Sequence, residues 1–471
     1  MSVVAKATLW FIFCSIMQKG IAFITTPIFT RLMTEEQFGQ YGVYTTWLNS
    51  ITIATTMRLN GAVFNKGMSK FKEDRDAYTA SMQTITFVLA AGAMLIYVLF
   101  RKPINALTEL PTFVMLGMFA ELLVTPAIEF WTVRKRYEYV YKPVVFRTLL
   151  MCVLNAGIGI LAVLMTEQKG YARIMSCIAV NICFGVALFL YNYRKSDVLY
   201  KKEYIIFALK FNLPLLLHYF SQYILDQFDR IMVQKLVNMA AAGIYTVAYN
   251  MGLLLRIVTT SINNAMTPWE YECLEENEHK KLDDTMFLVF IIVAGCSFVL
   301  SGFAPEIMHI LAPAKYYEGV YVVPPVSMGL FFSFMYTTFA NVEFFYDRNK
   351  FSMYISCSGA ALNILLNFIG IKLFGYIAAA YTTLICYMLF AMGHYIYMTL
   401  SIRKSMGIKR VFNTKRLVLL SASVLTFGLF IILFYDNLIL RYLVIAALLA
   451  TAYLNRARIK KALSVVKRKK R

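Results

Sequence analysis

Four polar side chains lie on one face of the seventh long apolar segment. His218, Gln222, Asp226 and Asp229 are spaced i, i+4, i+8 and i+11, which places them on one side of a helix. Such a face avoids lipid, because an ionised side chain at the bilayer centre costs about 2.5–3.5 kcal/mol on insertion scales. The face therefore either forms an interhelical hydrogen-bond network or lines an aqueous path. In the second case His218 and Gln222 would contact a substrate, and Asp226 and Asp229 would bind a coupling ion.

Cations also occur within the apolar segments. Lys19 lies near the middle of the first segment and Arg256 lies well inside the eighth, so neither can extend its charge to the interface as a residue near a helix end does. We predict that both line the same path, together with Gln18. Asn49 belongs to a polar stripe along the second segment. Arg58 falls on the opposite side of that stripe in an ideal helix, and both a path residue and a snorkelling residue fit this position.

Glu121 lies deep in the fourth apolar segment and is a further candidate for carrying a proton. No other chemistry is indicated. The sequence lacks the G-x-x-x-x-G-K-[ST] motif of ATP-hydrolysing P-loops, its four histidines have no ligand spacing, and its eight cysteines form no C-x-x-C pair. We expect no catalytic residue, no metal site and no cofactor, with H⁺ or Na⁺ as the candidate coupling ion.

Membrane-spanning helices must hold these residues. Of the 471 residues, 59% are hydrophobic and 15% are charged, whereas a soluble domain has about 25% charged residues. Apolar stretches of about 20 residues, the length of a membrane-spanning helix, recur along the chain. We predict an all-α integral membrane protein with about 14 transmembrane helices. The predicted helices cover residues 7–31, 38–62, 80–100, 112–133, 144–165, 171–192, 206–234, 240–266, 285–311, 321–345, 351–372, 376–400, 417–435 and 438–454.

The net charge of +21 is carried mainly by short loops between the predicted helices and by the stretch from Arg456 to Arg471. No soluble domain remains to hold a duplex, which excludes nucleic-acid binding. The basic loops alternate with less basic ones, and the positive-inside rule then places both termini in the cytoplasm. We expect the first segment to be a retained transmembrane helix and not a signal peptide.

Two parts of the chain repeat each other. Ile128-Glu129-Phe130-Trp131 is followed by Arg134, and Val342-Glu343-Phe344-Phe345 is followed by Arg348, at a constant offset. We interpret each Glu and the Arg five residues later as an architectural ion pair. The repeat unit is six helices, so both halves share one orientation and can enclose a central cavity. We predict an N-terminal half at 1–200, a C-terminal half at 201–402, and two extra helices with a basic tail at 403–471.

The segment from residue 25 to 51 resembles the start of the polysaccharide-export branch of the multidrug/oligosaccharidyl-lipid/polysaccharide (MOP) superfamily. The matching residues are Pro27, Arg31, Leu32, Gly39 and Tyr41. The resemblance implies a flippase for undecaprenyl-diphosphate-linked repeat units of O-antigen, capsule or exopolysaccharide in a bacterial inner membrane. It implies alternating access, and it suggests membrane lipids and the polysaccharide polymerase machinery as further partners.

The resemblance also bears on the cations. Related flippases place lumen cations on the first, second and eighth helices, which Lys19, Arg58 and Arg256 match, and Arg31 belongs to the shared segment. Lysine stands where relatives often have arginine, which keeps the charge but weakens bidentate contact with phosphate. The competing interpretations are an ion-coupled drug or cation antiporter of the same superfamily and a membrane-embedded glycosyltransferase. The latter would need a long external loop, so we expect a protein that is not an enzyme.

Overall fold

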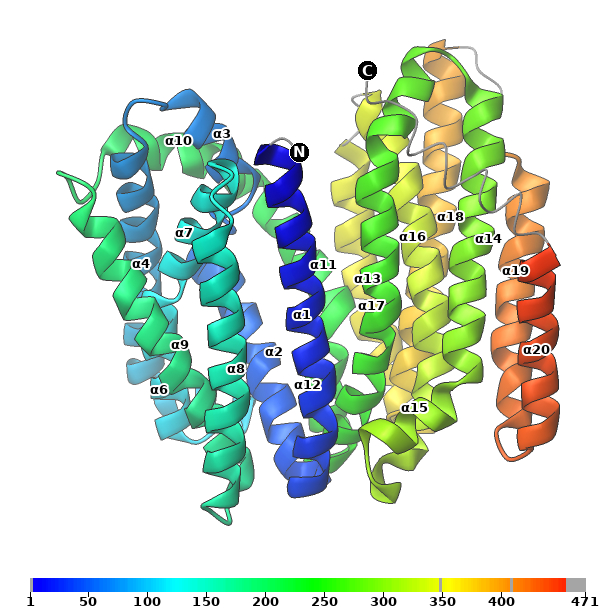
Figure 1. The fold of residues 1–471 in the computed structure, drawn as a ribbon, viewed down its shortest axis with the longest axis horizontal. Coiled ribbons are helices and arrows are strands. Elements are labelled where there is room, and N and C mark those ends of the chain that lie inside the picture. The colour runs from blue at the N-terminus through cyan, green and yellow to red at the C-terminus, as the bar shows by residue number, and fades with distance from the viewer. Residues whose placement is uncertain (1–2, 347–349, 407–409, 455–471) are drawn as a thin grey trace. The chain divides into compact units, whose positions relative to one another are not determined.

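The computed structural model describes residues 3–346, 350–406 and 410–454, and these residues form helices without a strand (Figure 1). The α-helices are α1 (Val3–Leu32), α2 (Glu35–Thr56), α3 (Ala62–Lys70), α4 (Arg75–Leu99), α5 (Arg101–Thr108), α6 (Thr112–Val124), α7 (Pro126–Tyr137), α8 (Lys142–Leu164), α9 (Lys169–Arg194), α10 (Lys202–Asn212), α11 (Leu216–Gln227), α12 (Asp229–Leu236), α13 (Met239–Glu275), α14 (His279–Gly302), α15 (Ala304–Leu311), α16 (Val323–Phe345), α17 (Lys350–Phe374), α18 (Ala378–Met406), α19 (Thr414–Phe430) and α20 (Leu438–Leu454). Three 3₁₀ helices, η1 (Leu213–Leu215), η2 (Ala314–Val322) and η3 (Ile431–Phe434), complete the list.

Eleven of the described helices are long and apolar enough to cross a membrane. The pair α10 and α11, bent by 55° around η1, makes up to twelve. Pro214 lies in η1 at this bend, and proline lacks the backbone donor that a continuous helix needs. The all-α membrane class is also confirmed. The number of fourteen stays a prediction, because α2 is not among these helices and α20 contributes only a shorter apolar stretch, Leu438–Thr451.

The chain packs as two compact units, each described by itself. Unit 1 comprises Met1–Tyr223 and Met239–Gly243, and unit 2 comprises Ile224–Asn238 and Ile244–Arg471. The first crossing between them falls within α11. The halves expected at 1–200 and 201–402, and the two extra helices at 403–471, stay a prediction.

Unit 1 contains α1 to α10. Helix α8 packs against α1 and α9, and α9 packs in turn against α6 and α2. The start of α13 also belongs to this unit, where it passes α2 at backbone distance. A Cβ atom added to Gly39 would lie 2.1 Å from the carbonyl oxygen of Met239, and one added to Gly243 would lie 2.0 Å from that of Glu35. Glycine at both positions is what permits this approach.

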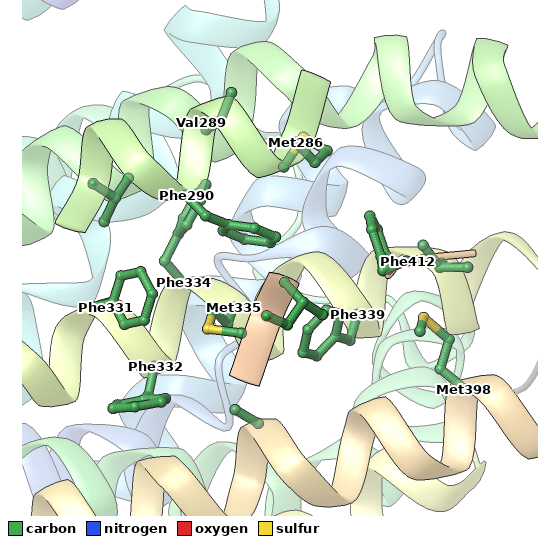
Figure 2. Close-up of a cluster of buried hydrophobic side chains, with 14 of the residues drawn as sticks. Met286, Val289, Phe290, Phe331, Phe332, Phe334, Met335, Phe339, Met398 and Phe412 are labelled. Carbon is green, nitrogen blue, oxygen red and sulfur yellow. The ribbon is translucent and has the colours of Figure 1, made fainter. Parts of the chain in front are cut away.

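Unit 2 has a core of aromatic and methionine side chains between α14, α16 and α18, shown in Figure 2. Phe290 of α14 contacts Phe334 and Phe339 of α16 edge to face, with ring centroids 5.7 and 6.3 Å apart. Phe412, just before α19, joins the same cluster. Lipid tails are as apolar as these side chains, so close packing and interhelical hydrogen bonds hold such helices together.

Three sequence-based expectations about local structure were wrong. Arg58 does not lie on the second helix, because α2 ends at Thr56 and the chain turns through left-handed backbone at Met57 (φ 48°) and Arg58 (φ 54°). Helix α13 continues through Pro268 to Glu275, where a loop was expected, because Cys273 and Leu274 pack into the core of unit 2.

The third error concerns the architectural ion pair of the first repeat. Arg134 does not pair with Glu129, but with Asp76 at 2.5 Å and with Glu138 at 2.9 Å. Glu138 is one turn beyond Arg134, a spacing at which side chains of a helix meet directly. The Arg348 of the second repeat lies outside the described residues.

Candidate functional site

Unit 1 encloses a cavity of about 380 Å³ between α1, α2, α6, α7, α8 and α9. Of its 20 lining residues, 14 have polar or charged side chains. These are Gln18, Asn49, Thr52, Thr56, Asn60, Glu121, Thr125, Glu129, Thr132, Arg136, Arg147, Thr148, Asn155 and Asn181. Ligand cavities are typically about 300–1,000 Å³, so this one can hold a small polar group.

The polar stripe of α2 forms one wall of this cavity. Asn49, Thr52 and Thr56 are spaced by three and four residues and therefore face the same way. Each threonine hydroxyl donates to a backbone carbonyl one turn earlier, at 2.7 Å in both cases. The Thr52 oxygen can still accept a hydrogen bond from a ligand, whereas the Thr56 oxygen already accepts one from the backbone N–H of Arg58 at 3.3 Å. Gln18 of α1 completes this side, so the structure brings together two of the predicted lining residues, Gln18 and Asn49.

Glu121 of α6 lies at the cavity wall with only 3% of its surface exposed. Its two carboxylate oxygens accept hydrogen bonds from the Tyr44 hydroxyl and from the Asn181 amide, both at 2.7 Å. Asn181 in turn accepts from Asn155 at 3.4 Å. The carboxyl group is thus held by neutral donors, which is compatible with gain and loss of a proton.

Two cations line the cavity that the sequence did not single out for binding. Arg147 of α8 donates to the Thr132 hydroxyl at 2.5 Å and lies 5.6 Å from the ring centroid of Trp131. Arg136 and Glu129 of α7 line the same cavity. Arg147 lies near the start of α8, where the sequence favours a snorkelling side chain. Arg147 and the residues of α7 belong to different helices, so helical spacing cannot show that they face one cavity. Only the tertiary fold brings them together.

The other predicted residues of unit 1 lie outside this cavity. Lys19 is exposed on α1, next to Gln18. Arg31 is exposed and donates to the carbonyl of Pro27 at 3.0 Å. Arg58 is exposed, with its guanidinium 6.0 Å from the Tyr219 ring. His218 and Gln222 are half-buried on α11 and are not among the lining residues.

In unit 2, Asp226 and Arg256 form a bidentate ion pair. The two terminal nitrogens of Arg256 donate to the two Asp226 oxygens at 2.8 and 2.9 Å. The Tyr387 hydroxyl adds a third hydrogen bond to the carboxylate at 2.5 Å. A fork-to-fork pair is among the strong interactions that proteins make. The Arg256 charge, predicted to bind substrate, is therefore engaged by Asp226 in this conformation.

Asp229 has a different environment, in which the hydrogen-bond donors are neutral and the buried Arg230 guanidinium acts on the carboxylate only through its charge. It is 1% exposed, and its oxygens accept from the Tyr245 hydroxyl at 2.8 Å, the Asn367 amide at 2.8 Å and the Thr383 hydroxyl at 2.9 Å. Asn363 extends this network to Thr383 at 3.0 Å. These partners come from α13, α17 and α18, so Asp229 joins three helices to the start of α12.

The Asp229 network is rich in oxygen ligands. Its carboxylate, hydroxyl and amide oxygens are of the kind that a hard cation prefers. Sequence spacing identified Asp229 but missed Asn363, Asn367 and Thr383 as its partners. The only available signal was Asn363, which matches Asn155 in the internal repeat. Among the described residues, no group of three or more His, Cys, Asp and Glu could hold a metal ion.

Unit 2 also has an apolar groove of about 950 Å³ formed by α13, α14, α15, α19 and α20. Its lining is almost wholly aliphatic and aromatic, with Glu306 at one point. Arg441 of α20, 2% exposed, donates to Glu306, as does the Tyr442 hydroxyl at 2.9 Å. This polar contact fixes α20 to α15 beside the groove.

The fold and these clusters define an integral membrane protein of the transporter type, and comparison with known proteins gives the family. Residues 4–272 match the family described as "Polysaccharide biosynthesis protein", and residues 214–369 match the MatE family. The first match spans more than half of the chain, so the chain belongs to the polysaccharide biosynthesis protein family. The resemblance to the polysaccharide branch of the MOP superfamily is thereby confirmed.

Relatives and solved structures agree with this family. The chain is 20% identical over 351 residues to "Lsg locus putative protein 1" of Haemophilus influenzae, covering 70% of this chain and 82% of that protein. It shares its fold with the lipid II flippase MurJ (TM-score 0.71, 13% identity, 96% of this chain and 100% of that one). It also shares the fold of a multidrug resistance MATE family transporter of the MOP superfamily (TM-score 0.60, 13% identity, 82% and 96% covered).

Proposed function

We propose that this protein is a flippase that moves undecaprenyl-diphosphate-linked oligosaccharide repeat units across a bacterial inner membrane by alternating access. The repeat units would belong to O-antigen, capsule or exopolysaccharide, and both termini would be cytoplasmic. The observation that carries the proposal is the polar cavity of unit 1 in a chain of the polysaccharide biosynthesis family.

The cavity has the chemistry that a sugar requires. Its threonine, asparagine and glutamine side chains both donate and accept hydrogen bonds, as the hydroxyl groups of a carbohydrate do. Its charges, Glu121 and Glu129 against Arg136 and Arg147, are balanced in number. A neutral sugar can therefore bind without burying an unpaired charge, which would be costly.

The two remaining parts of such a substrate have candidate sites as well. The diphosphate would bind exposed cations, for which Lys19, Arg31 and Arg58 are the candidates, since phosphate contacts are charge-assisted. The polyprenyl tail would bind in the apolar groove beside α19 and α20, which is almost free of polar groups. The lipid chain then never needs to enter a polar cavity.

Translocation of a charged headgroup needs a source of free energy. Asp229 is the favoured coupling residue, because a buried carboxylate among neutral oxygen-bearing side chains is neutralised by a cation or a proton. Binding there would draw α12, α13, α17 and α18 together. Asp226 is less suited to this role because Arg256 already neutralises it, and Glu121 is a separate candidate in unit 1.

Lipid analysis of a deletion strain tests the proposal. Lipid-linked glycan should accumulate on the cytoplasmic leaflet, and a plasmid-borne wild-type copy should remove it. Arg147→Ala should restore export about tenfold less well than wild type, whereas Arg101→Ala, an exposed arginine of α5 outside the cavity, should restore it fully. A deletion strain without retained glycan would contradict the flippase function.

A second candidate is an ion-coupled drug or cation antiporter. It is favoured by the match of residues 214–369 to the MatE family and by the acidic pair Asp226 and Asp229. This alternative predicts changed drug sensitivity of the deletion strain and no retained glycan, so the same strain distinguishes the two functions.

A further inference from the structure

Glu270 is a buried carboxyl group that none of the sites above uses. It lies near the end of α13 in unit 2 with 1% of its surface exposed. One carboxylate oxygen accepts a hydrogen bond from the Asn341 amide of α16 at 2.9 Å. The other oxygen is buried and has no hydrogen-bond partner. Side chains of α13 and α16 therefore hold an incompletely paired acid.

The groups around Glu270 contain more acceptors than donors. The Asn341 nitrogen also lies 3.1 Å from the Asn263 amide oxygen and 3.1 Å from the Thr267 hydroxyl oxygen. The Thr267 hydroxyl hydrogen is used on the backbone carbonyl of Asn263 at 2.8 Å. The two hydrogens of one amide thus face three acceptors, and the second Glu270 oxygen is a fourth. Reversing the Asn341 amide would add a further acceptor, so both orientations leave the cluster short of hydrogens.

In the part of the chain that the structure describes, no cation compensates the Glu270 charge. Among the described residues, none of the ion pairs includes Glu270. On α16, Glu343 lies two residues beyond Asn341 and bonds His394 of α18 at 3.0 Å. On α13 itself, the Tyr271 ring lies 5.3 Å from that of Phe345, and Glu272 is exposed. An isolated carboxylate at such a position is costly, whereas a neutral carboxylic acid is not.

We propose that Glu270 binds a proton and is a second ion site of this protein, separate from Asp229. The added proton neutralises the buried carboxylate and supplies one of the hydrogens that the cluster lacks. A proton fits better than a metal ion. The Asn341 amide nitrogen already lies within hydrogen-bond distance of the Glu270, Asn263 and Thr267 oxygen atoms, so it occupies the position that a metal ion would need. The proton site stands on this geometry, whereas its part in transport rests on the proposed function.

Helix α13 joins the two ion sites. Tyr245 near its start bonds Asp229, and Glu270 lies 25 residues further along, roughly 37 Å at the rise of an α-helix. A cation at Asp229 would bind one end of α13 to α17 and α18, and a proton at Glu270 would bind the other end to α16. The two events therefore act on one helix from opposite ends.

Infrared difference spectroscopy of the full-length protein in lipid tests the proton site without any substrate. Spectra recorded across pH should show a carboxylic acid C=O band that disappears in Glu270→Gln. The band should persist in Glu276→Gln, which changes an exposed glutamate in the turn after α13. A wild-type protein without such a band, or a Glu270→Gln protein that retains it, would overturn the proposal.

A second variant covers the case in which Glu270→Gln does not fold. Asn341→Ala keeps the carboxyl group but removes its hydrogen-bond donor, so the band should shift in frequency and not vanish. An unshifted band would show that it belongs to another carboxyl group and would overturn the assignment.

The transport role is read separately. Glu270→Gln should lower export at least tenfold in the complementation assay and remove its pH dependence. Wild-type export by Glu270→Gln at every pH would overturn the coupling role, although the infrared band would still establish the proton site. Failure of the flippase function itself would instead appear as a deletion strain without retained glycan.

Discussion

The two units of the chain hold their polar groups in different ways. In unit 1, glutamates, arginines, threonines and amides line a cavity with room for a ligand, although Glu121 among them already accepts two hydrogen bonds. In unit 2, Asp226 and Asp229 are each closed into a network with three or more protein hydrogen bonds. An open polar wall suits a ligand that brings its own donors and acceptors, whereas a closed network suits an ion small enough to replace one proton or one hydrogen bond.

This difference predicts a division of labour. Substitutions in unit 1, apart from those at the candidate proton carrier Glu121, should change which sugar is exported and how fast, and leave ion dependence unchanged. Substitutions around Asp229 should change ion dependence. The four predictions below test this division, from the largest expected effect to the smallest.

Arg256→Ala should have the largest effect, because it removes the cation that forms a bidentate pair with Asp226. We expect export to be abolished and stability to fall by about 2 kcal/mol, less than the 3–5 kcal/mol of a fully buried pair because both side chains are more than a quarter exposed. Thermal unfolding in detergent measures the loss. Adding Asp226→Asn should recover part of the stability. Arg403→Ala, which changes an exposed arginine of α18, is the matched control. Unchanged export by Arg256→Ala would remove Arg256 from the substrate path.

Lys19→Ala should abolish export without affecting folding. The side chain is exposed, so its removal should change stability by no more than about 0.5 kcal/mol. Membrane insertion measured by fractionation should equal that of wild type. Lys6→Ala, an exposed lysine earlier on α1, provides the comparison. Full complementation by Lys19→Ala would show that the diphosphate binds elsewhere.

Asp229→Asn should separate ion binding from folding. The substitution nearly preserves the shape of the side chain and removes its charge, so the protein should fold but lose ion dependence. Wild type should melt at a higher temperature when Na⁺ replaces choline, since a ligand that binds only the folded state stabilises it. The variant should show no such shift, or no pH-dependent shift if the ion is H⁺. An Asp229→Asn protein with the full wild-type response would place the ion site elsewhere.

Asp74→Asn should have a small effect that depends on pH. Slight burial acts to raise the pKa of Asp74, but hydrogen bonds from Lys201 and Tyr204 outweigh it and lower the pKa below its usual value. A lowered pKa means that the carboxylate stabilises the fold above pH ~4 and loses this effect as the pH falls further. The Asp74–Lys201 pair is largely exposed. The free energy of unfolding of wild type should therefore exceed that of the variant by at most about 0.5 kcal/mol at neutral pH. A stability difference between wild type and variant that grows toward acid pH would contradict a lowered pKa of Asp74.

Much of the fold followed from the sequence, because a span needs about 20 apolar residues and backbone groups in lipid must bond within the helix. The ends of helices were less predictable. Nothing in the local pattern indicates that α2 stops at Thr56, because the left-handed turn at Met57 and Arg58 is set by packing around it. The sequence likewise placed Glu270 in a loop, because the packing that extends α13 to Glu275 is not visible in the local pattern.

The site residues divide similarly. Helical spacing identified Gln18, Asn49 and Glu121, all of which line the cavity. Asp226 and Asp229 were also identified, because a carboxylate inside an apolar segment is unusual whatever its spacing. Their partners come from α13, α17 and α18, more than 15 residues away in sequence, and asparagine, threonine and tyrosine are too common in membrane helices to draw attention.

The contact between Arg441 and Glu306 bears on whether the last two helices can be removed from the protein. A chain that ended before α20 would leave Glu306 without Arg441 and would remove the wall of the apolar groove formed by Leu448, Leu449 and Thr451. Helices α19 and α20 are therefore an integral layer of unit 2. A chain truncated before α20 should be degraded during biogenesis. Fluorescent or affinity tags should therefore follow α20 and not replace it.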